Sequence, residues 1–322
     1  MKFSIITAVL NNKACIASCL DSVRSQTYPD IEHIIVDGGS TDGTLEVIKA
    51  GEGLEVIGNG EETTKAGDRS EVIGNRKPVH DPLPITRLIS EPDNGIYDAL
   101  NKGIRLATGD VIGFLHADDF YANATVIDNV EKAMTEQNSD SCYGDLVYVR
   151  ETGNRPGVIG NRQDKDEETG DKSGGRGHGK DDRNGSVGIG ERKFKIVRYW
   201  KAGPYDRRLF RKGWMPPHPT FFVRSDVYRR MGGFDTSLGI AADYELMLRF
   251  LWKNNISACY IPEVLVKMRT GGASNGSIRS IIRKSSEDYR AMRMHGAGGF
   301  MTLLRKNVSK IPQFVKRNRD SD

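Results

Sequence analysis

The sequence predicts an α/β fold, a Rossmann-like and mostly parallel sheet flanked by helices. In the first half of the chain, short apolar runs alternate with longer segments whose apolar residues recur every three to four positions. The short runs are nearly continuous in apolar character, which is typical of strands buried on both faces. Alternating strands and helices of this kind form doubly wound parallel sheets, which bind ligands beyond the carboxyl ends of their strands.

The elements of the first half are placed from these apolar patterns. Strands are expected at residues 3–9, 31–36, 85–90 and 110–115. Helices are expected at residues 16–27, 44–49 and 96–107, and a further helical pattern starts near Asn123. Polar residues follow each of the four strands, so we expect them at one edge of the sheet; they are Asn11, Asp37, Asp93 and Asp118.

The second half resumes an ordered pattern near residue 193. Strands are expected at residues 195–200, 220–223, 256–261 and 264–268, and helices at 225–231, from 243, and at 278–289. No long linker separates the two halves. The sequence therefore predicts a single domain over residues 1–270 and a basic helical C-terminal extension over residues 271–322.

Two segments break the pattern, residues 51–84 and 151–192. The second is rich in glycine and charged residues, and the phrase Val-Ile-Gly-Asn occurs three times, at 56–59, 72–75 and 158–161. Neither segment carries enough apolar surface to order itself. We interpret both as low-complexity inserts that form surface loops and are dispensable for fold and activity.

Composition limits the class of protein. The chain has 322 residues, 28% of them charged, and a formal net charge of +4, which is too small to indicate a nucleic-acid partner. No apolar run approaches the roughly 18 residues needed to cross a bilayer, and the N-terminal run is interpreted as a strand. Four cysteines without metal-ligand spacing favour a reducing, cytoplasmic location.

The most informative motif is His116-Ala117-Asp118-Asp119, which directly follows a predicted strand. Adjacent carboxylates at the end of a buried strand are unfavourable unless a cation lies beside them. Mg²⁺ chelated by a diphosphate would supply that charge, because it takes only one or two protein carboxylates. The alternative is that both residues cap the following helix.

Together with further motifs, this tetrapeptide resembles glycosyltransferase family 2. The motifs occur in the family's order at residues 7–11, 36–44, 93–103, 107–110, 116–119, 232–235 and 242–246. The resemblance covers residues 1–50, 85–150 and about 194–312. It implies an inverting, nucleotide-sugar-dependent enzyme with the GT-A fold.

The resemblance also implies how the nucleotide is bound. Asp37 would accept a hydrogen bond from the base, and an acceptor-only carboxylate suits the N–H edge of uracil or guanine; the alternative is a turn-forming aspartate. Thr7 and Asn11 would border the same pocket, although Asn11 fits a plain loop residue equally well. Asp93 would contact the nucleoside.

The phosphates and the metal would lie at the next strand ends. Lys102 could reach a phosphate or belong to a solvated charged face. Asp118 matches the family's metal-binding aspartate, and Asp119 is grouped with it as a ligand for Mg²⁺ or Mn²⁺. His116 stands where the family's first acidic residue is expected, and would contact ribose or stabilise the turn.

The resemblance implies that Asp243 is the catalytic base. In a single in-line displacement, a base takes the acceptor's hydroxyl proton as that oxygen attacks the anomeric carbon. The alternative is a helix N-cap. Trp214 and His218 are assigned to the acceptor region, with an incidental packed loop as the alternative.

The expected function is a metal-dependent inverting transfer of sugar from a nucleotide-diphosphate donor to a glycan or lipid-linked acceptor, in cell-surface polysaccharide biosynthesis. Two alternatives stay open: a catalytically inactive sugar-nucleotide binding module, and a sugar-nucleotide pyrophosphorylase, whose glycine-rich loop is missing after the first strand.

From Arg290 onward the chain is basic with apolar interruptions. This pattern is typical of peripheral contact with the inner face of the plasma membrane, or of a helix that docks on the domain.

Overall fold

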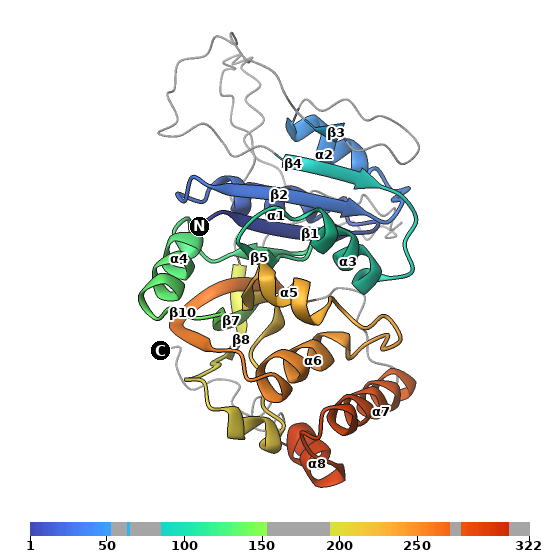
Figure 1. Ribbon diagram of the computed structural model, residues 1–322. Helices are drawn as coiled ribbons and strands as arrows, with labels where there is room; N and C mark the ends of the chain where they lie inside the picture. Colours follow the sequence, from blue (N-terminus) through green and yellow to red (C-terminus); the bar gives the residue numbers. More distant parts are fainter. Residues whose placement is uncertain (53–62, 65–84, 153–193, 271–277, 309–322) are drawn as a thin grey trace, which may run out of the picture.

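The computed structural model describes residues 1–52, 63–64, 85–152, 194–270 and 278–308 (Figure 1). These residues form one ten-stranded mixed sheet in the order β3-β4-β2-β1-β5-β9-β7-β10-β6, with β8 paired to β7. The strands are β1 Phe3–Val9, β2 Ile31–Asp37, β3 Thr63–Thr64, β4 Ile85–Ser90, β5 Val111–Phe114, β6 Asp119–Tyr121, β7 Ser141–Glu151, β8 Phe194–Trp200, β9 Phe222–Arg224 and β10 Ala258–Arg269.

Helices and helical turns connect and cover the strands. They are α1 Ile16–Arg24, α2 Thr44–Glu52, α3 Ile96–Leu106, α4 Val126–Glu136, 3-10 turns η1 Arg207–Lys212 and η2 His218–Thr220, α5 Ser225–Met231, α6 Ala242–Met247, the π-helical η3 Leu248–Lys253, α7 Ile278–Met294 and α8 Phe300–Val308. The predicted α/β fold with a mostly parallel sheet, flanking helices and helical C-terminal region is confirmed.

The first half of the sheet is parallel, and this places the site. β1 pairs in parallel with both β2 and β5, and β2 pairs in parallel with β4. In register, Val9 lies opposite Asp37, and Asp37 lies opposite Ser90. The carboxyl ends of these strands therefore meet at one edge, where parallel sheets bind ligands.

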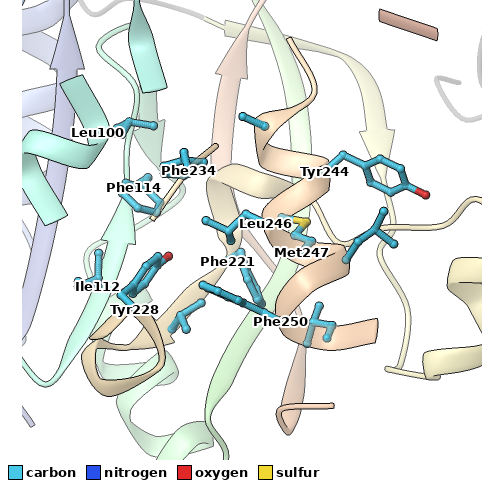
Figure 2. Packing of buried hydrophobic residues seen from close by; sticks show 14 of the residues in the cluster. Leu100, Ile112, Phe114, Phe221, Tyr228, Phe234, Tyr244, Leu246, Met247 and Phe250 are labelled. Carbon is cyan, nitrogen blue, oxygen red and sulfur yellow. The ribbon is translucent and has the colours of Figure 1, made fainter. Parts of the chain in front are cut away.

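Two hydrophobic cores cover the two faces of the sheet. On one face, Ile6 and Phe114 belong to a cluster with residues of α3, α5 and α6 (Figure 2). On the other, Phe3 and Ile5 belong to a cluster with residues of α1, α2 and α4. Because successive side chains of a strand point to opposite faces, a continuous apolar run such as β1 fills both cores.

The second half differs in detail from the sequence-based expectation. β6 and β7 were not predicted, and β10 is one strand where two were expected. Its register against β7 shifts between Ile261 and Val264. Pro262 lies in this interval and has no N–H to donate, so the chain bulges there and then resumes pairing.

The described part of the C-terminal region packs against α6 (Figure 1). His295 at the end of α7 contacts Glu245 of α6 at 2.7 Å, from Nε2 to Oε1. None of the described helices is long and apolar enough to cross a membrane. Most of both predicted inserts, and residues 309–322 of the predicted extension, lie outside the described part of the chain.

Candidate active site

Asp37 ends β2 and is completely buried. Its Oδ2 accepts hydrogen bonds from the backbone N–H of Gly39 at 3.2 Å and from the hydroxyl of Ser90 at 2.7 Å. Its Oδ1 accepts from the Ser40 hydroxyl at 2.5 Å. The carboxylate thus holds the turn after β2, as in the turn-forming alternative.

Thr7 and Asn11 serve the scaffold of this edge. Thr7 has no exposed surface, and its hydroxyl lies 3.0 Å from Nε2 of His33. Asn11 has a positive φ of 49° and its Oδ1 accepts from the backbone N–H of Thr41 at 2.8 Å. Asn11 therefore shapes the loop after β1, and Thr7 offers no surface to a nucleotide.

Asp93 lies directly over the turn after β2. Its Oδ1 accepts from the Gly95 N–H at 2.8 Å, and a Cβ added at Gly38 would lie 2.4 Å from its Oδ2. Glycine at position 38 therefore allows this close approach. Lys102 bonds the same loop, because its Nζ lies 2.7 Å from Glu91 Oε1 and donates to the Pro92 carbonyl at 3.0 Å.

The two adjacent acids after β5 differ sharply. Asp119 is completely buried, and burial, reinforced by Asp118, raises its pKa well above the ordinary value, while Arg269 acts in the opposite direction. Asp118 is partly exposed, and no described residue hydrogen-bonds its carboxylate. Asp118 is thus the acid available to a ligand.

The partly exposed His116 and the buried His218 form a pair beside these acids. Their ring centroids are 5.8 Å apart, and His218 also stacks on Phe114 at 5.5 Å. Burial lowers the pKa of His218 to about 3. Burial also lowers the pKa of His116, while the carboxylates of Asp118 and Asp243 act on it in the opposite direction. Both acids therefore lie within electrostatic reach of His116.

Asp243 is the second residue of α6, and Ala241 occupies the N-cap position. Asp243 is partly exposed, whereas every other residue of this helix is buried. Tyr97 of α3 lies beside it: burial raises the pKa of this phenol, and the Asp243 carboxylate raises it further. The helix thus presents one carboxylate toward the strand-end edge.

Trp214 belongs to an aromatic cluster in the core. Its Nε1 donates to the Ala202 carbonyl at 3.0 Å, and its ring meets Phe210 and Tyr143 edge-on at 5.4 and 5.9 Å. The ring is partly buried there. Its described contacts are therefore those of a packed side chain.

Comparison with known proteins decides the family. The model of the family described as glycosyl transferase family 2 matches residues 4–75 and 77–200. The chain belongs to glycosyl transferase family 2.

Relatives of this family member include glycosyltransferases of mycobacteria. A PGL/p-HBAD biosynthesis glycosyltransferase of Mycobacterium bovis is 36% identical over 148 residues, 45% of this chain and 46% of the relative. The match thus spans about half of that relative's length. An uncharacterized glycosyltransferase of Mycobacterium tuberculosis is 27% identical over 248 residues, 76% of this chain and 67% of the relative.

Solved structures share the GT-A fold with this family member. Staphylococcus aureus TarS 1–349 in complex with UDP-GlcNAc has a TM-score of 0.55 at 16% identity, covering 92% of this chain and 65% of TarS 1–349. The mannosyltransferase PcManGT of Pyrobaculum calidifontis, in complex with GDP-Man and Mn²⁺, has a TM-score of 0.54 at 16% identity, covering 99% and 76% of the two chains.

Three residues near the edge where the parallel strands end were not predicted from the sequence of this family 2 chain. Arg269 donates from Nη1 to the Asp118 carbonyl at 2.9 Å and supplies positive charge beside the two acids. Tyr97 and Glu287 both contact the loop before α6. Tyr97 lies inside a recognised motif, but no local pattern marks Arg269 or Glu287.

Proposed function

We propose that this chain is a metal-dependent inverting glycosyltransferase that moves a sugar from a nucleotide-diphosphate donor to a glycan or lipid-linked acceptor in cell-surface polysaccharide biosynthesis. One observation carries the proposal: Asp118 and Asp243 both act electrostatically on His116. This supports one shared site for the two partly exposed carboxylates, as a displacement needs for its leaving group and its base.

Asp243 is the proposed base. As the acceptor oxygen attacks the anomeric carbon, the hydroxyl proton passes to the Asp243 carboxylate, and the bond to the diphosphate breaks on the opposite face of the sugar. The buried surroundings of α6 and the neighbouring Tyr97 restrict the position of this carboxylate. A fixed base lowers the barrier because it needs little reorganisation during the reaction.

Asp118 is the proposed protein ligand of a metal shared with the donor. The described residues hold no cluster of three or more histidine, cysteine, aspartate or glutamate side chains that could form an all-protein metal cage. They do fit an ion bound largely by phosphate oxygens, because Mg²⁺ takes only one or two carboxylates. When bound, Mg²⁺ or Mn²⁺ neutralises charge that develops on the leaving diphosphate.

The nucleoside is proposed to lie on the loops after β2 and β4. Asp37 holds the floor of this region through Ser40 and Ser90, while Asp93 presents a partly exposed carboxylate above it. A carboxylate there suits the N–H edge of uracil or guanine. UDP- and GDP-sugars are therefore the proposed donors, and the neighbouring structures with UDP-GlcNAc and GDP-Man are consistent with both.

The acceptor is proposed to enter beside His218 and α6. A lipid-linked acceptor is supported by α8, where Phe300 and Met301 are 68% and 63% exposed next to the exposed, basic Arg305. Apolar and basic groups on one helix favour peripheral contact with an anionic membrane. Cosedimentation with vesicles containing 30% phosphatidylserine tests this part, and loss of binding in Phe300→Ser/Met301→Ser is the expected result.

The inactive binding module is not favoured. A module would have no use for a base, yet Asp243 is the one residue of α6 that is partly exposed. The pyrophosphorylase alternative is not favoured either, because the family assignment is to glycosyl transferases.

The experiment pairs donor binding with turnover. A thermal-shift panel of UDP-GlcNAc, UDP-glucose, GDP-mannose and dTDP-glucose, with and without Mn²⁺, identifies the donor, because a ligand of the folded state raises its apparent stability. Asp243→Asn should retain the donor's thermal shift and lose roughly 10²–10⁴-fold in release of the nucleoside diphosphate.

Asp226→Asn is the matched control, because Asp226 forms an exposed ion pair with Arg230 on the surface of α5. It should leave both readouts unchanged. Turnover retained in Asp243→Asn would remove this residue from the mechanism.

A further inference from the structure

The loop before Asp243 is held from two sides by helices distant in sequence. From α7, Oε2 of Glu287 accepts hydrogen bonds from the backbone N–H of Ile240 at 2.6 Å and of Ala241 at 3.1 Å. From α3, the hydroxyl of Tyr97 donates to the Ile240 carbonyl at 3.0 Å. Both backbone polar groups of Ile240 are thus hydrogen-bonded. Ile240 lies two residues before the start of α6 and three residues before Asp243.

These bonds hold the start of a helix that has no side-chain N-cap of its own. The first N–H groups of a helix need acceptors, and Ala241 at the N-cap has no side-chain oxygen to provide one. A carboxylate at this end also interacts favourably with the helix dipole. Glu287 therefore bonds the N-cap amide of α6, as the glutamate of a capping box does, but from another helix.

The geometry around Glu287 is closely packed. Oε1 of Glu287 accepts from Nε of Arg283 at 2.9 Å, and the Glu287 side chain is 14% exposed against 64% for Arg283. A Cβ added at Gly239 would lie 2.4 Å from Nη2 of Arg283, so the Arg283 side chain approaches this loop closely.

The charge of Glu287 is maintained despite its burial. Burial acts to raise the pKa of Glu287, but the Ile240 N–H and the Arg283 guanidinium outweigh it, and the pKa lies below the ordinary value. An ionised carboxylate is the stronger acceptor for the two amides.

α7 itself is anchored close to Glu287. The next residue, Asp288, is buried in an ion pair with Lys306 of α8, and Ala291 and Met292 are completely buried. The acceptor for the loop amides is therefore presented by a helix anchored in the core, which makes it suited to positioning.

We propose that Glu287 is a positioning residue for Asp243, so that the C-terminal helix α7 completes the active site. The proposal rests on the proposed role of Asp243 as base. A small displacement of a reacting group lowers the rate by about 10²-fold while substrate binding is retained. The expected signature of Glu287 loss is therefore a fall in turnover with little change in donor affinity.

The test compares Glu287→Ala with Glu287→Gln and Arg283→Gln. Release of UDP from UDP-GlcNAc and of GDP from GDP-mannose is measured with Mn²⁺, together with hydrogen exchange over residues 236–246. Glu287→Ala should lower kcat by roughly 10–100-fold with KM for the donor within about threefold, and accelerate exchange at Ile240 and Ala241 at least about tenfold.

The two other variants separate positioning from general stability. Glu287→Gln keeps an acceptor oxygen and should recover most of the turnover. Arg283→Gln removes the ion pair but leaves the Glu287 bonds to the two amides in place, so its loss of turnover should be much smaller than that of Glu287→Ala. In the Asp243→Asn background, Glu287→Ala should cause no further loss beyond about twofold, because both act on one step.

Unchanged exchange at the two amides in Glu287→Ala overturns the proposal without any substrate. An unchanged kcat in Glu287→Ala, with Asp243→Asn inactive, overturns it while leaving the proposed function intact. Activity retained in Asp243→Asn instead counts against the proposed base, and the positioning role falls with it.

Discussion

The ammonium group of Lys306 lies 2.8 Å from the carboxylate of Asp288, and both side chains are almost completely buried, at 4% and 3% exposed. Lys306 Nζ also lies 3.2 Å from the ring centroid of Tyr244 in α6. One buried cation therefore connects α8, α7 and the helix that carries Asp243. Of the two interpretations of the basic C-terminal segment, docking on the domain describes α7 and this face of α8.

Removing one partner of this pair should destabilise the protein strongly. Lys306→Met or Asp288→Asn leaves an uncompensated buried group, which typically costs about 3–5 kcal/mol of unfolding free energy. The double variant Asp288→Asn/Lys306→Met should recover most of that loss. Urea denaturation followed by circular dichroism measures all three, with Arg305→Gln, an exposed neighbour on α8, as the control. Equal losses in the double and single variants would contradict the pairing.

Acid should destabilise the fold through buried histidine. His33 is 2% exposed, and burial, together with Arg24, lowers its pKa to about 3. The unfolded chain takes up a proton below its ordinary pKa of about 6.5 while the folded chain does not, so stability falls as pH decreases through that value.

The measurement compares His33→Asn with the unmodified chain. Between pH 7 and pH 5, the decrease in unfolding free energy should be about 2 kcal/mol smaller in the variant. Glu32 does not interfere: although its burial acts in the opposite direction, hydrogen bonds from Ser4 and Thr108 lower its pKa to about 2. Its contribution is lost only below the unfolded value near 4.5. Parallel pH profiles of the two proteins would rule out this role of His33.

The segment between β7 and β8 should be replaceable by a tight turn. Glu151 at the end of β7 pairs with Phe194 at the start of β8, so residues 152–193 connect adjacent ends of an antiparallel hairpin. Two residues such as Asn-Gly suffice for such a connection. The shortened protein should unfold within a few degrees of the original and keep its turnover.

A longer deletion provides the control. Extending it through Trp200 also removes β8 and the bond from the Tyr199 hydroxyl to Asp145 at 2.7 Å, and should lower the melting temperature clearly. A shortened hairpin that folds but is inactive would show that the segment takes part in function.

Asp118 and Asp119 should respond differently to neutral replacement. Asp118→Asn removes the proposed metal ligand and should lower Mn²⁺-stimulated release of nucleoside diphosphate by roughly 10²–10³-fold, a loss similar to that on removing one electrostatic stabiliser. EDTA should have a comparable effect on the unmodified chain. Asp119→Asn should keep activity within about threefold, because Asp119 is completely buried and its burial raises its pKa. Equal losses in both variants would indicate that Asp119 is also a ligand.

Much of the first half of the fold could be predicted, because buried parallel strands are visible as continuous apolar runs. β1 and β4 have the predicted bounds, and β2 extends one residue further, to Asp37. β7 was missed because its interior carries Asp145. That carboxylate is tolerated only through distant partners, the hydroxyls of Tyr199 and Tyr260 and the Ala202 N–H.

The site residues were likewise predictable from the sequence only in part. Their motifs lie at strand ends and at a helix start, and order along the chain was enough to assign the family. Order along the chain does not reveal which carboxylates stay available. The Asp37 carboxylate accepts hydrogen bonds from the Ser40 and Ser90 hydroxyls, and Asp119 is buried. Asp118 and Asp243, in contrast, are partly exposed.

The amino-acid sequence by itself determined the α/β class, the family and the set of acids near the strand ends, because periodicity and motif spacing are local properties. Only the tertiary structure decided which acids stay accessible and how the loop before Asp243 is held. Those outcomes depend on contacts between distant segments, such as Glu287 with Ile240, 47 residues away. Burial and hydrogen-bond partners of this kind arise when the chain has folded, and no local pattern records them.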